Sequence, residues 1–597
     1  YLHGVQVVGG SNPLAPTNFL VEILSKSNNS LHTISGTIVL ITMIMGISMA
    51  SIQRWILAFS TLILIAGLSA CSQKSEEKPK QAENTPPEII ATHPLDGLTP
   101  NEIKQVLSVL RKENLVDDQS FYPLIELLEP PKSEVLAWKV GQAFNRKAYV
   151  NFKGLKGSQE AIVDITNQKV EKIAALEGEP MLMLEEFMTS MKVALENPDF
   201  IKGLEKRNLK PSDVFCLPLT AGNFLQQAEK GKRLMKVPCY VNPTGSNYYA
   251  KPVEGLFAEV DLKAKKVVQV VDEGVVPLPK DDWGYTESEL AKRTPVRESS
   301  KLVEGGSSLP ITIKGSGIEW DIWKFRYRVD KRPGVVLSAV NVKDADKWRS
   351  VLYQANLSEV FVPYQDPGKA WYWRTLPGVL HQDNGQPVEI PNAICVFERD
   401  VGRPAWRHYE IFAQSDKQAV PAEGRVAKEL VLRSASEVGN YDYLVDYVFQ
   451  QNGSINIDVI ATGIDAVKGV HTKHLKDETA KSDTKYGSLI APHLVAPNHD
   501  HYFNFRLDFD IDGTDNTFYK TSLDKGPVDK NSPRKSFWVA NPKPIASELE
   551  GRLRIDNERP ALYTVVNSNL EGQLGHQPSY AIMPRDTVAY GPYDYEN

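Results

Sequence analysis

The sequence predicts an α+β protein in which two small, repeated α+β domains precede a large antiparallel β-sandwich. A hairpin pattern of alternating apolar and polar residues occurs from Ala161 to Ile173 and again from Ala258 to Val270, each time after a helical pattern. Beyond residue 313, short alternating strands follow one another with turn signals such as "KRPG", "QNGS" and "DIDG" and without a long helical pattern. A chain of 597 residues is also too long for one hydrophobic core.

The N-terminal region carries targeting signals, not a folded element. Residues 1–48 are interpreted as a non-native upstream extension, because Tyr1 is not an initiator. From Met49, a basic residue and an apolar run from Trp55 to Gly67 lead to Leu-Ser-Ala-Cys, which resembles the bacterial lipoprotein processing box. Residues 49–71 are therefore predicted to be a lipoprotein signal peptide with lipid attached to Cys71. A short membrane anchor that includes the apolar stretch from Ile38 is the alternative.

Either interpretation places the rest of the chain outside the cytoplasm, on the periplasmic side of a bacterial membrane to which the lipid anchors it. Residues 72–91 are charged, polar and proline-rich at their end, and we expect a flexible linker there.

The two small domains are predicted at residues 92–184 and 185–290. The first begins with Thr99 as the N-cap of a helix, Pro100 at its first position and Glu102 three residues after the cap. A second helix, Phe187 to Leu209, precedes the second hairpin. Residues 291–312 are a linker rich in glycine, serine and charge, and residues 313–597 form the β-sandwich, which we expect to carry the chemistry and to be incomplete at its C-terminal end.

Composition excludes some classes of partner and site. The net charge of −6 lacks the basic surplus of nucleic-acid-binding proteins, so no nucleic-acid partner is expected. Four cysteines are too few for a disulfide scaffold and lack the spacing of a zinc site.

Two groups of side chains in the sandwich indicate metal binding. His499 and His501 stand two apart in a strand pattern, so both imidazoles project from one face and can converge on one metal ion; a pair of solvated histidines is the alternative. Asp508 and Asp510 share one face of the next stretch, where like charges repel unless a cation screens them. Asp508, Phe509 and Asp510 are predicted to bind calcium or a similar ion, whereas Asp512 is explained by an Asp-Gly turn.

These residues resemble a known family. The sequence resembles the copper amine oxidases in "VGNYDY", followed by His499-Asp500-His501 and "FRLDFDIDG". The resemblance extends through "SEVFVPYQDP", "ATGIDAVKG" and "DETAKSDTKYG". It covers most of residues 92–597, including the two small domains before the sandwich.

The resemblance implies a function and its residues. Tyr441 would be oxidised to topaquinone by dioxygen and a copper ion on His499 and His501, and the quinone would oxidise a primary amine to an aldehyde, releasing ammonia and hydrogen peroxide. Asn440 would orient the quinone, and Tyr364 would hydrogen-bond its ring oxygen. The family forms dimers, so a homodimer is also implied.

The chain departs from the family pattern in two places. Gly378 aligns with the aspartate that serves as the family's catalytic base, and Leu376 aligns with its aromatic gate; Asp383 is a weak substitute because "QDNG" reads as a turn. A third copper histidine is also missing, because His576, the remaining histidine after His501, matches a non-ligand part of the pattern. These departures leave a second hypothesis open, an impaired or inactive relative with a binding or scaffold role. A metal-dependent hydrolase is disfavoured, because no suitably spaced glutamate base accompanies the histidines.

Overall fold

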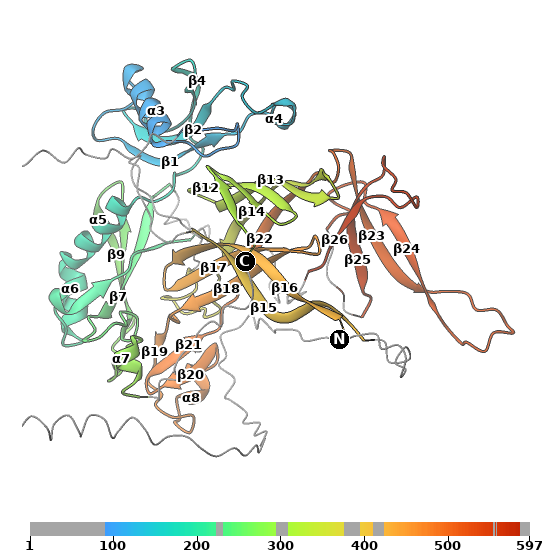
Figure 1. Ribbon diagram of the computed structural model, residues 1–597. Coiled ribbons are helices and arrows are strands. Elements are labelled where there is room, and N and C mark those ends of the chain that lie inside the picture. Colours follow the sequence, from blue (N-terminus) through green and yellow to red (C-terminus); the bar gives the residue numbers. More distant parts are fainter. Residues whose placement is uncertain are drawn as a thin grey trace, which may run out of the picture. The chain divides into compact units, whose positions relative to one another are not determined.

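The computed structural model describes residues 90–222, 231–293, 309–374, 394–409, 423–552, 556 and 558–584 (Figure 1). Some of the predictions concern residues outside this described part. They are the predictions for residues 1–48, for 49–71 with Cys71, for 72–89, and for Leu376, Gly378 and Asp383. Antiparallel strands dominate the described part, in six sheets. Among the described residues, the helices are all too short or too polar to cross a membrane.

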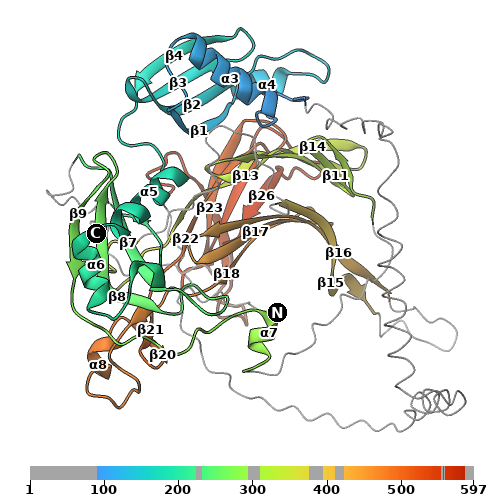
Figure 2. The same ribbon diagram turned by 90° about the vertical axis from the view of Figure 1, so that its left-hand side faces the viewer.

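The first small domain packs helix α3 (Pro100–Lys112) against a four-stranded sheet (Figure 2). The sheet has the order β1-β2-β3-β4, formed by Phe121–Leu128, Lys147–Gly154, Gly157–Asp164 and Lys169–Ala175. The predicted capping box at Thr99 and Glu102 is confirmed, because each side chain accepts a hydrogen bond from the other residue's backbone N–H. A short helix, α4 (Lys132–Ala137), connects β1 to β2.

The second small domain repeats this plan. Its sheet runs β5-β7-β8-β9, formed by Val214–Cys216, Leu234–Val241, Pro252–Asp261 and Lys266–Asp272, with β6 (Leu219–Thr220) paired to β7. The single helix predicted from Phe187 to Leu209 is wrong: α5 (Leu184–Leu195) and α6 (Pro198–Glu205) are separate. The Asn197 side chain caps α6 and Pro198 occupies its first turn, so the chain restarts a helix there. The short η1 (Pro211–Asp213) and α7 (Glu287–Leu290) complete the helices.

Both predicted hairpins are confirmed in matching register. Ala161 faces Ile173 across β3 and β4, and Ala258 faces Val270 across β8 and β9. The repeat seen in the sequence is therefore a repeat of strand pairing.

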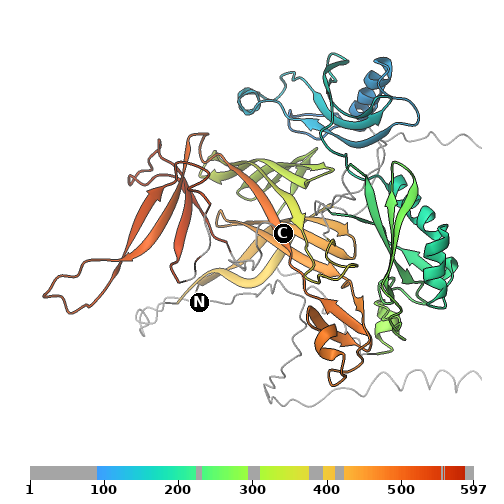
Figure 3. The same ribbon diagram turned by 180° about the vertical axis from the view of Figure 1, so that it is seen from behind.

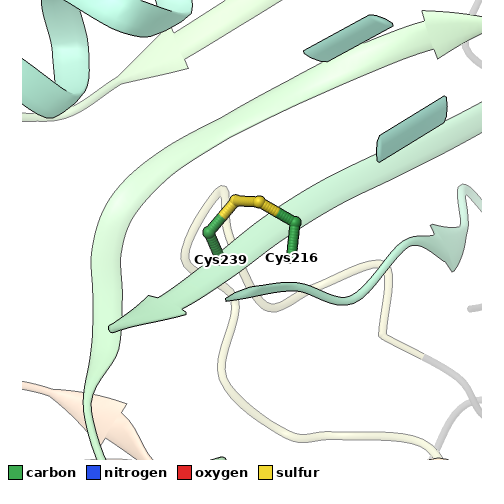
Figure 4. The surroundings of a disulfide bond; sticks show 2 residues. All are labelled: Cys216 and Cys239. Carbon is green, nitrogen blue, oxygen red and sulfur yellow. A yellow bond between two sulfur atoms is a disulfide. The ribbon is translucent and has the colours of Figure 1, made fainter. Parts of the chain in front are cut away.

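A disulfide between Cys216 and Cys239 joins β5 to β7 (Figure 4). Sequence analysis missed this bond, because residues 23 apart become neighbours only when the two strands pair. Both cysteines are buried in the core of the second small domain.

The large domain is antiparallel β, as predicted. One sheet contains β10 (Thr312–Lys314), β11 (Gly317–Trp320), β12 (Trp323–Asp330), β13 (Gly334–Asp344), β14 (Lys347–Phe361) and β22 (Tyr502–Phe509), in that order. A second contains β15 (Ile394–His408), β16 (Glu423–Val438), β17 (Tyr441–Gln450) and β18 (Ile455–Gly463). Buried side chains of the two sheets, such as Trp323, Leu337, Leu432 and Phe449, form one core.

Two smaller sheets complete the domain. The first is β19-β21-β20, formed by Lys468–Gly469, Leu494–Pro497 and Gly487–Ala491, with α8 (Ala480–Asp483) nearby in the chain. The second is β24-β23-β25-β26, formed by Trp538–Pro544, Asn516–Lys525, Ala561–Asn567 and Ser579–Ile582 and drawn in red in Figure 3. His576 lies in the connection from β25 to β26.

Candidate active site

Tyr441 is the first residue of β17, directly after the tight turn that joins β16 to β17. Val438 pairs with Tyr441 across this turn, so Gly439 and Asn440 form it, and Gly439 adopts a φ of 66° that favours glycine. The buried Asn440 side chain donates a hydrogen bond to the carbonyl oxygen of Ile464 (2.5 Å). Asn440 thus fixes the turn, and the turn fixes the position of the Tyr441 ring, which is 6% exposed.

Two tyrosines of β17 meet the two predicted metal-ligating histidines in matched pairs. The Tyr441 hydroxyl lies 2.7 Å from His499 Nε2, and the Tyr443 hydroxyl lies 2.7 Å from His501 Nδ1. Alternation along a strand puts residues two apart on one face, so the two tyrosines face the two histidines. The His499 and His501 ring centroids are 5.0 Å apart, so the structure brings together the imidazoles that the sequence predicted to converge.

Tyr364 covers the other side of His499. The two residues form an isolated antiparallel β-bridge, and their rings stack with centroids 4.5 Å apart. The Tyr364 hydroxyl is buried close enough to the Tyr441 hydroxyl to influence its pKa, but it makes no hydrogen bond of regular geometry with a described residue. A buried hydroxyl without a partner is costly and rare, and it indicates that a further polar group belongs at this position.

Asp465 supplies a carboxylate to the same centre. Its Oδ1 accepts a hydrogen bond from the Tyr441 hydroxyl (3.2 Å), and the residue itself is exposed. The Tyr441 ring is therefore held between a buried imidazole and a carboxylate that solvent reaches.

Burial keeps the Tyr441 hydroxyl and the imidazoles of His499 and His501 uncharged. It raises the pKa of Tyr441 far above its usual value, and Tyr364 and Asp465 add to the effect. It lowers the pKa of His499, and it lowers the pKa of His501 to about 4, where His499 contributes as well. Both imidazoles are therefore neutral at pH 7, which is the form that binds a metal ion.

The donor set fits a copper ion in part. Two neutral imidazoles and a phenol oxygen lie together. His499 Nδ1–H donates a hydrogen bond to the Pro497 carbonyl oxygen (2.9 Å), which fixes the direction of the ring. Within the described residues, however, no third histidine, cysteine or carboxylate joins the two imidazoles to form a metal-binding group. The partnerless Tyr364 hydroxyl fits a ring oxygen introduced at Tyr441.

The acidic pair predicted to hold calcium contacts a cationic side chain of the protein. The Lys132 ammonium group, at the start of α4, donates hydrogen bonds to Asp508 Oδ1 (2.7 Å) and Asp510 Oδ1 (2.6 Å) and lies over the Tyr353 ring. Phe509 between them packs its ring against the main core. Lys132 thus screens the two like charges for which calcium or a similar ion is predicted. Asp512, with a φ of 51°, lies in the expected turn and pairs with Arg349.

Sequence reasoning missed two residues of the centre, Tyr443 and Asp465. Tyr443 carried a usable signal, because it stands two residues after Tyr441, just as His501 stands two after His499. Asp465 carried none, since an aspartate shortly after a strand is typical of any turn.

The chain matches three family descriptions. They are "Copper amine oxidase, N2 domain" over residues 93–175, "Copper amine oxidase, N3 domain" over 185–285, and "Copper amine oxidase, enzyme domain" over 312–377 and 372–594. The enzyme-domain match divides near residue 375, where the sequence departs from the family pattern.

Curated relatives and solved structures agree with these matches. The primary amine oxidase of Klebsiella aerogenes is 33% identical over 527 residues, covering 82% of this chain and 68% of the relative. The copper-containing amine oxidase gamma 1 of Arabidopsis thaliana is 31% identical over 540 residues, covering 83% and 75%. The fold is similar to that of a copper-containing benzylamine oxidase from Hansenula polymorpha, with a TM-score of 0.69 at 20% identity over 85% of this chain and 84% of that one. The chain belongs to the copper amine oxidase family.

Proposed function

We propose that this protein oxidises primary amines to aldehydes, using copper and a topaquinone made from Tyr441. The observation that carries the proposal is the buried contact of the Tyr441 hydroxyl with His499 Nε2 at 2.7 Å. Copper bound at this place would supply, together with dioxygen, the oxidation of Tyr441, and the quinone so formed would supply an acceptor for the electrons of the amine.

The chain's own residues would prepare the site for this chemistry. His499 and His501 would hold the metal as neutral imidazoles, and Asn440 would keep the ring in place through the Ile464 carbonyl. Tyr364 would donate its unused hydroxyl hydrogen to a ring oxygen. The surrounding apolar residues, among them Val362, Trp371 and Val438, limit the access of water to the ring.

A second function is favoured by one observation. Only two metal-ligating side chains of the predicted kind meet within the described residues, and a two-histidine site binds copper more weakly than a complete one. The alternative is a relative that binds a partner or ligand without turnover.

Phenylhydrazine titration together with copper analysis decides between the two. A processed Tyr441 forms a coloured adduct in stoichiometric amount, and the Tyr441→Phe variant forms none. Wild-type protein that is reconstituted with copper in air and yields neither adduct nor bound copper would contradict the oxidase and support the alternative.

We also propose that the protein is anchored by lipid at Cys71 to a bacterial membrane, on its periplasmic side. The Cys216–Cys239 disulfide supports an oxidising compartment, because such bonds persist mainly outside the cytoplasm. Metabolic labelling with a radioactive fatty acid tests this, since Cys71→Ala should abolish the label. A homodimer and a bound calcium ion remain predictions from the family resemblance and the acidic residues.

A further inference from the structure

The segment from Tyr364 to Arg374 forms a closed loop beside the candidate active site. The Tyr364 backbone N–H donates a hydrogen bond to the Arg374 carbonyl oxygen (3.3 Å), so the two ends of the loop meet. At one end Tyr364 stacks on His499, and within the loop the Trp371 ring lies 5.4 Å from the Tyr364 ring, measured between centroids. The position of Tyr364 therefore depends on how the loop 364–374 is held.

Glu254, in strand β8 of the second small domain, holds Trp371. One of its carboxylate oxygens accepts a hydrogen bond from Trp371 Nε1 (3.0 Å), and the other accepts one from the backbone N–H of Gly469 (3.0 Å). The Trp371 side chain is fully buried. Since a buried indole N–H needs an acceptor, Glu254 fixes the ring that packs against Tyr364.

Lys236, in strand β7 of the same domain, holds the next two residues of the loop. Its side chain is almost completely buried, and its ammonium group lies over the rings of Tyr372 and Trp373, at 5.1 and 5.2 Å from their centroids. The ammonium group also donates a hydrogen bond to the Tyr372 hydroxyl (3.4 Å) and pairs with Glu259 on the neighbouring strand (3.4 Å). The attraction between a cation and aromatic rings is strongest where water is excluded, so this contact fastens the loop to the small domain.

The second small domain also reaches the turn before Tyr441. The Tyr249 hydroxyl donates a hydrogen bond to the carbonyl oxygen of Gly439 in that turn (3.1 Å). Phe257, in β8, belongs to the hydrophobic cluster that contains Tyr364 and Tyr441. Separate side chains of one domain thus contact the surroundings of both tyrosines.

The internal repeat shows that the carboxylate on Trp371 is not needed to build a small domain. Ala161 and Ala258 occupy equivalent positions in the two hairpins. Four residues before each alanine, the first small domain has Gly157 and the second has Glu254. The two domains share their strand pairing, so Glu254 is an addition to the common plan.

We infer that the second small domain positions the residues of the candidate active site. Glu254 and Lys236 are positioning residues for Tyr364, and Tyr249 is the positioning residue for the turn that carries Tyr441. The inference rests on the proposed function, since it assigns these residues a role at the same centre. All three act through the residues that they hold, at a distance from the reacting atoms.

Copper binding tests the role of Glu254 without turnover. Because Tyr364 stacks on His499, release of Trp371 should disturb an imidazole that would hold the metal. The full purified chain, stripped of metal and kept free of dioxygen, is titrated with Cu²⁺, and His499→Ala identifies the binding that belongs to this site. Loss of a direct partner of a metal ligand typically weakens binding by about 10–100-fold, and Glu254 acts from further away, so we expect Glu254→Leu to weaken it at least about threefold.

Conservative variants and a second route separate positioning from packing. Glu254→Gln keeps an acceptor for Trp371 Nε1 and should bind Cu²⁺ nearly as well as wild type. Lys236→Met removes the cation from the two aromatic rings and should weaken Cu²⁺ binding in the same direction as Glu254→Leu. Lys236→Arg keeps the charge and should weaken it less.

Glu186→Leu is the matched control within the second small domain. Glu186, in α5, is also a largely buried carboxylate, but its hydrogen bonds go to Arg233 and to the Met183 backbone, inside the domain. Its replacement should lower the free energy of unfolding, measured with urea, and leave Cu²⁺ binding unchanged.

Hydrogen–deuterium exchange of the metal-free chain locates each effect. Glu254→Leu and Lys236→Met should speed the exchange of backbone amides in the loop 364–374. Tyr249→Phe should speed the exchange of those in residues 438–441, because the turn loses the hydrogen bond to Gly439. Glu186→Leu should change neither segment.

Unchanged exchange in both segments would overturn the inference, whether or not wild type binds Cu²⁺. Cu²⁺ binding that is equal in wild type, Glu254→Leu and Lys236→Met would also overturn it, and so would an equal loss in Glu186→Leu. Phenylhydrazine titration in air separates this inference from the oxidase proposal. An adduct in wild type without these effects of Glu254 and Lys236 overturns the positioning role alone, and the effects without an adduct overturn the oxidase alone.

Discussion

Tyr364 keeps a buried hydroxyl group that makes no hydrogen bond of regular geometry with a described residue, and such a group lowers the stability of the folded protein. Its burial also raises the pKa of that hydroxyl, so it stays protonated and can donate. The buried hydroxyl thus lowers the stability of the fold but provides a hydrogen-bond donor at the candidate active site. Loss of stability in exchange for function is common in active sites.

The Tyr364→Phe variant should therefore separate stability from activity. We expect its free energy of unfolding to equal or exceed that of wild type by up to ~1 kcal/mol, because an unsatisfied polar group is removed. Amine oxidation should fall roughly tenfold or more, because a donor to the ring oxygen is lost. Urea unfolding and peroxide release measure the two effects.

Tyr447→Phe is the matched control. Its hydroxyl is also buried and makes no hydrogen bond of regular geometry with a described residue. Tyr447 lies on the same strand β17, but in the main core and away from the histidines. It should change stability in the same direction and leave oxidation unaffected. A loss of stability in Tyr364→Phe would contradict our account of its hydroxyl.

At the scale of elements, the site depends on how closely β18 approaches the turn before β17. Gly463 faces Tyr441 across the two strands, with a φ of 101°. A Cβ atom there would lie 2.7 Å from the Asn440 carbonyl oxygen and 2.9 Å from the Tyr441 Cα, both of which are backbone atoms that cannot simply rotate away.

Gly463→Ala should therefore displace the turn that positions Tyr441. Gly453→Ala is the control, because Gly453 also has a positive φ (85°) but its Cβ would meet nothing closer than the Tyr580 hydroxyl at 4.0 Å. Both variants should lose roughly 1–2 kcal/mol from backbone strain. Gly463→Ala alone should lose further stability and form less phenylhydrazine adduct; equal behaviour of the two would show that the contact is unimportant.

The Lys132 contact joins α4 of the first small domain to β22 and the residue after it. Asp510 is almost fully buried and Asp508 is close to it, so removal of the ammonium group leaves two carboxylates facing each other. We expect Lys132→Met to lower the free energy of unfolding by roughly 1–2 kcal/mol, less than for a fully buried pair because the Lys132 side chain is 31% exposed.

Calcium should stabilise this variant more than the wild type, since the vacated carboxylates can bind a divalent ion without displacing Lys132. Thermal unfolding with and without calcium measures this, and Lys139→Met, which replaces an exposed lysine of the same segment, should behave as wild type. Equal stabilisation of the wild-type chain by calcium would show that the ion displaces Lys132 or binds elsewhere.

Local signals were predictable from sequence, and long-range contacts were not. The Thr99–Glu102 capping box and the two hairpins depend on residues a few positions apart, so their patterns are visible in the sequence. The Asn197-Pro198 break in the second helix was also visible, but the apolar periodicity on both sides obscured it. The Lys132–Asp508 contact joins residues 376 positions apart, and no pattern in the sequence predicts such a contact. The contact between Tyr441 and His499 was expected from the family resemblance. Periodicity alone predicts only which face of its own strand a side chain occupies, not which other strand it meets.

At the scale of the whole molecule, the pH dependence of stability has a component that links the first small domain to the large one. Burial raises the pKa of Glu126 to about 7, and the charge of Asp330 adds to this. The folded state therefore prefers the protonated acid. The stability gained from that protonation is present below the unfolded pKa near 4.5 and is lost as the pH rises through about 7.

Glu126→Gln should remove this dependence. At pH 5 the variant and wild type should unfold at similar urea concentrations, and at pH 8 the variant should be more stable by roughly 1–3 kcal/mol. Glu177→Gln, at an exposed carboxylate after β4, should follow wild type at both pH values. A constant difference between Glu126→Gln and wild type across this range would rule out the protonation effect.

The sulfur bridge of the second small domain also has a practical consequence for anyone who makes this protein. Cys216 and Cys239 face each other across paired strands inside a core, so a chain folded where thiols stay reduced would enclose two uncoupled sulfurs in that core. Recombinant material from the bacterial cytosol would then differ covalently from exported material. Counting accessible thiols after denaturation should therefore precede any assay on a new preparation.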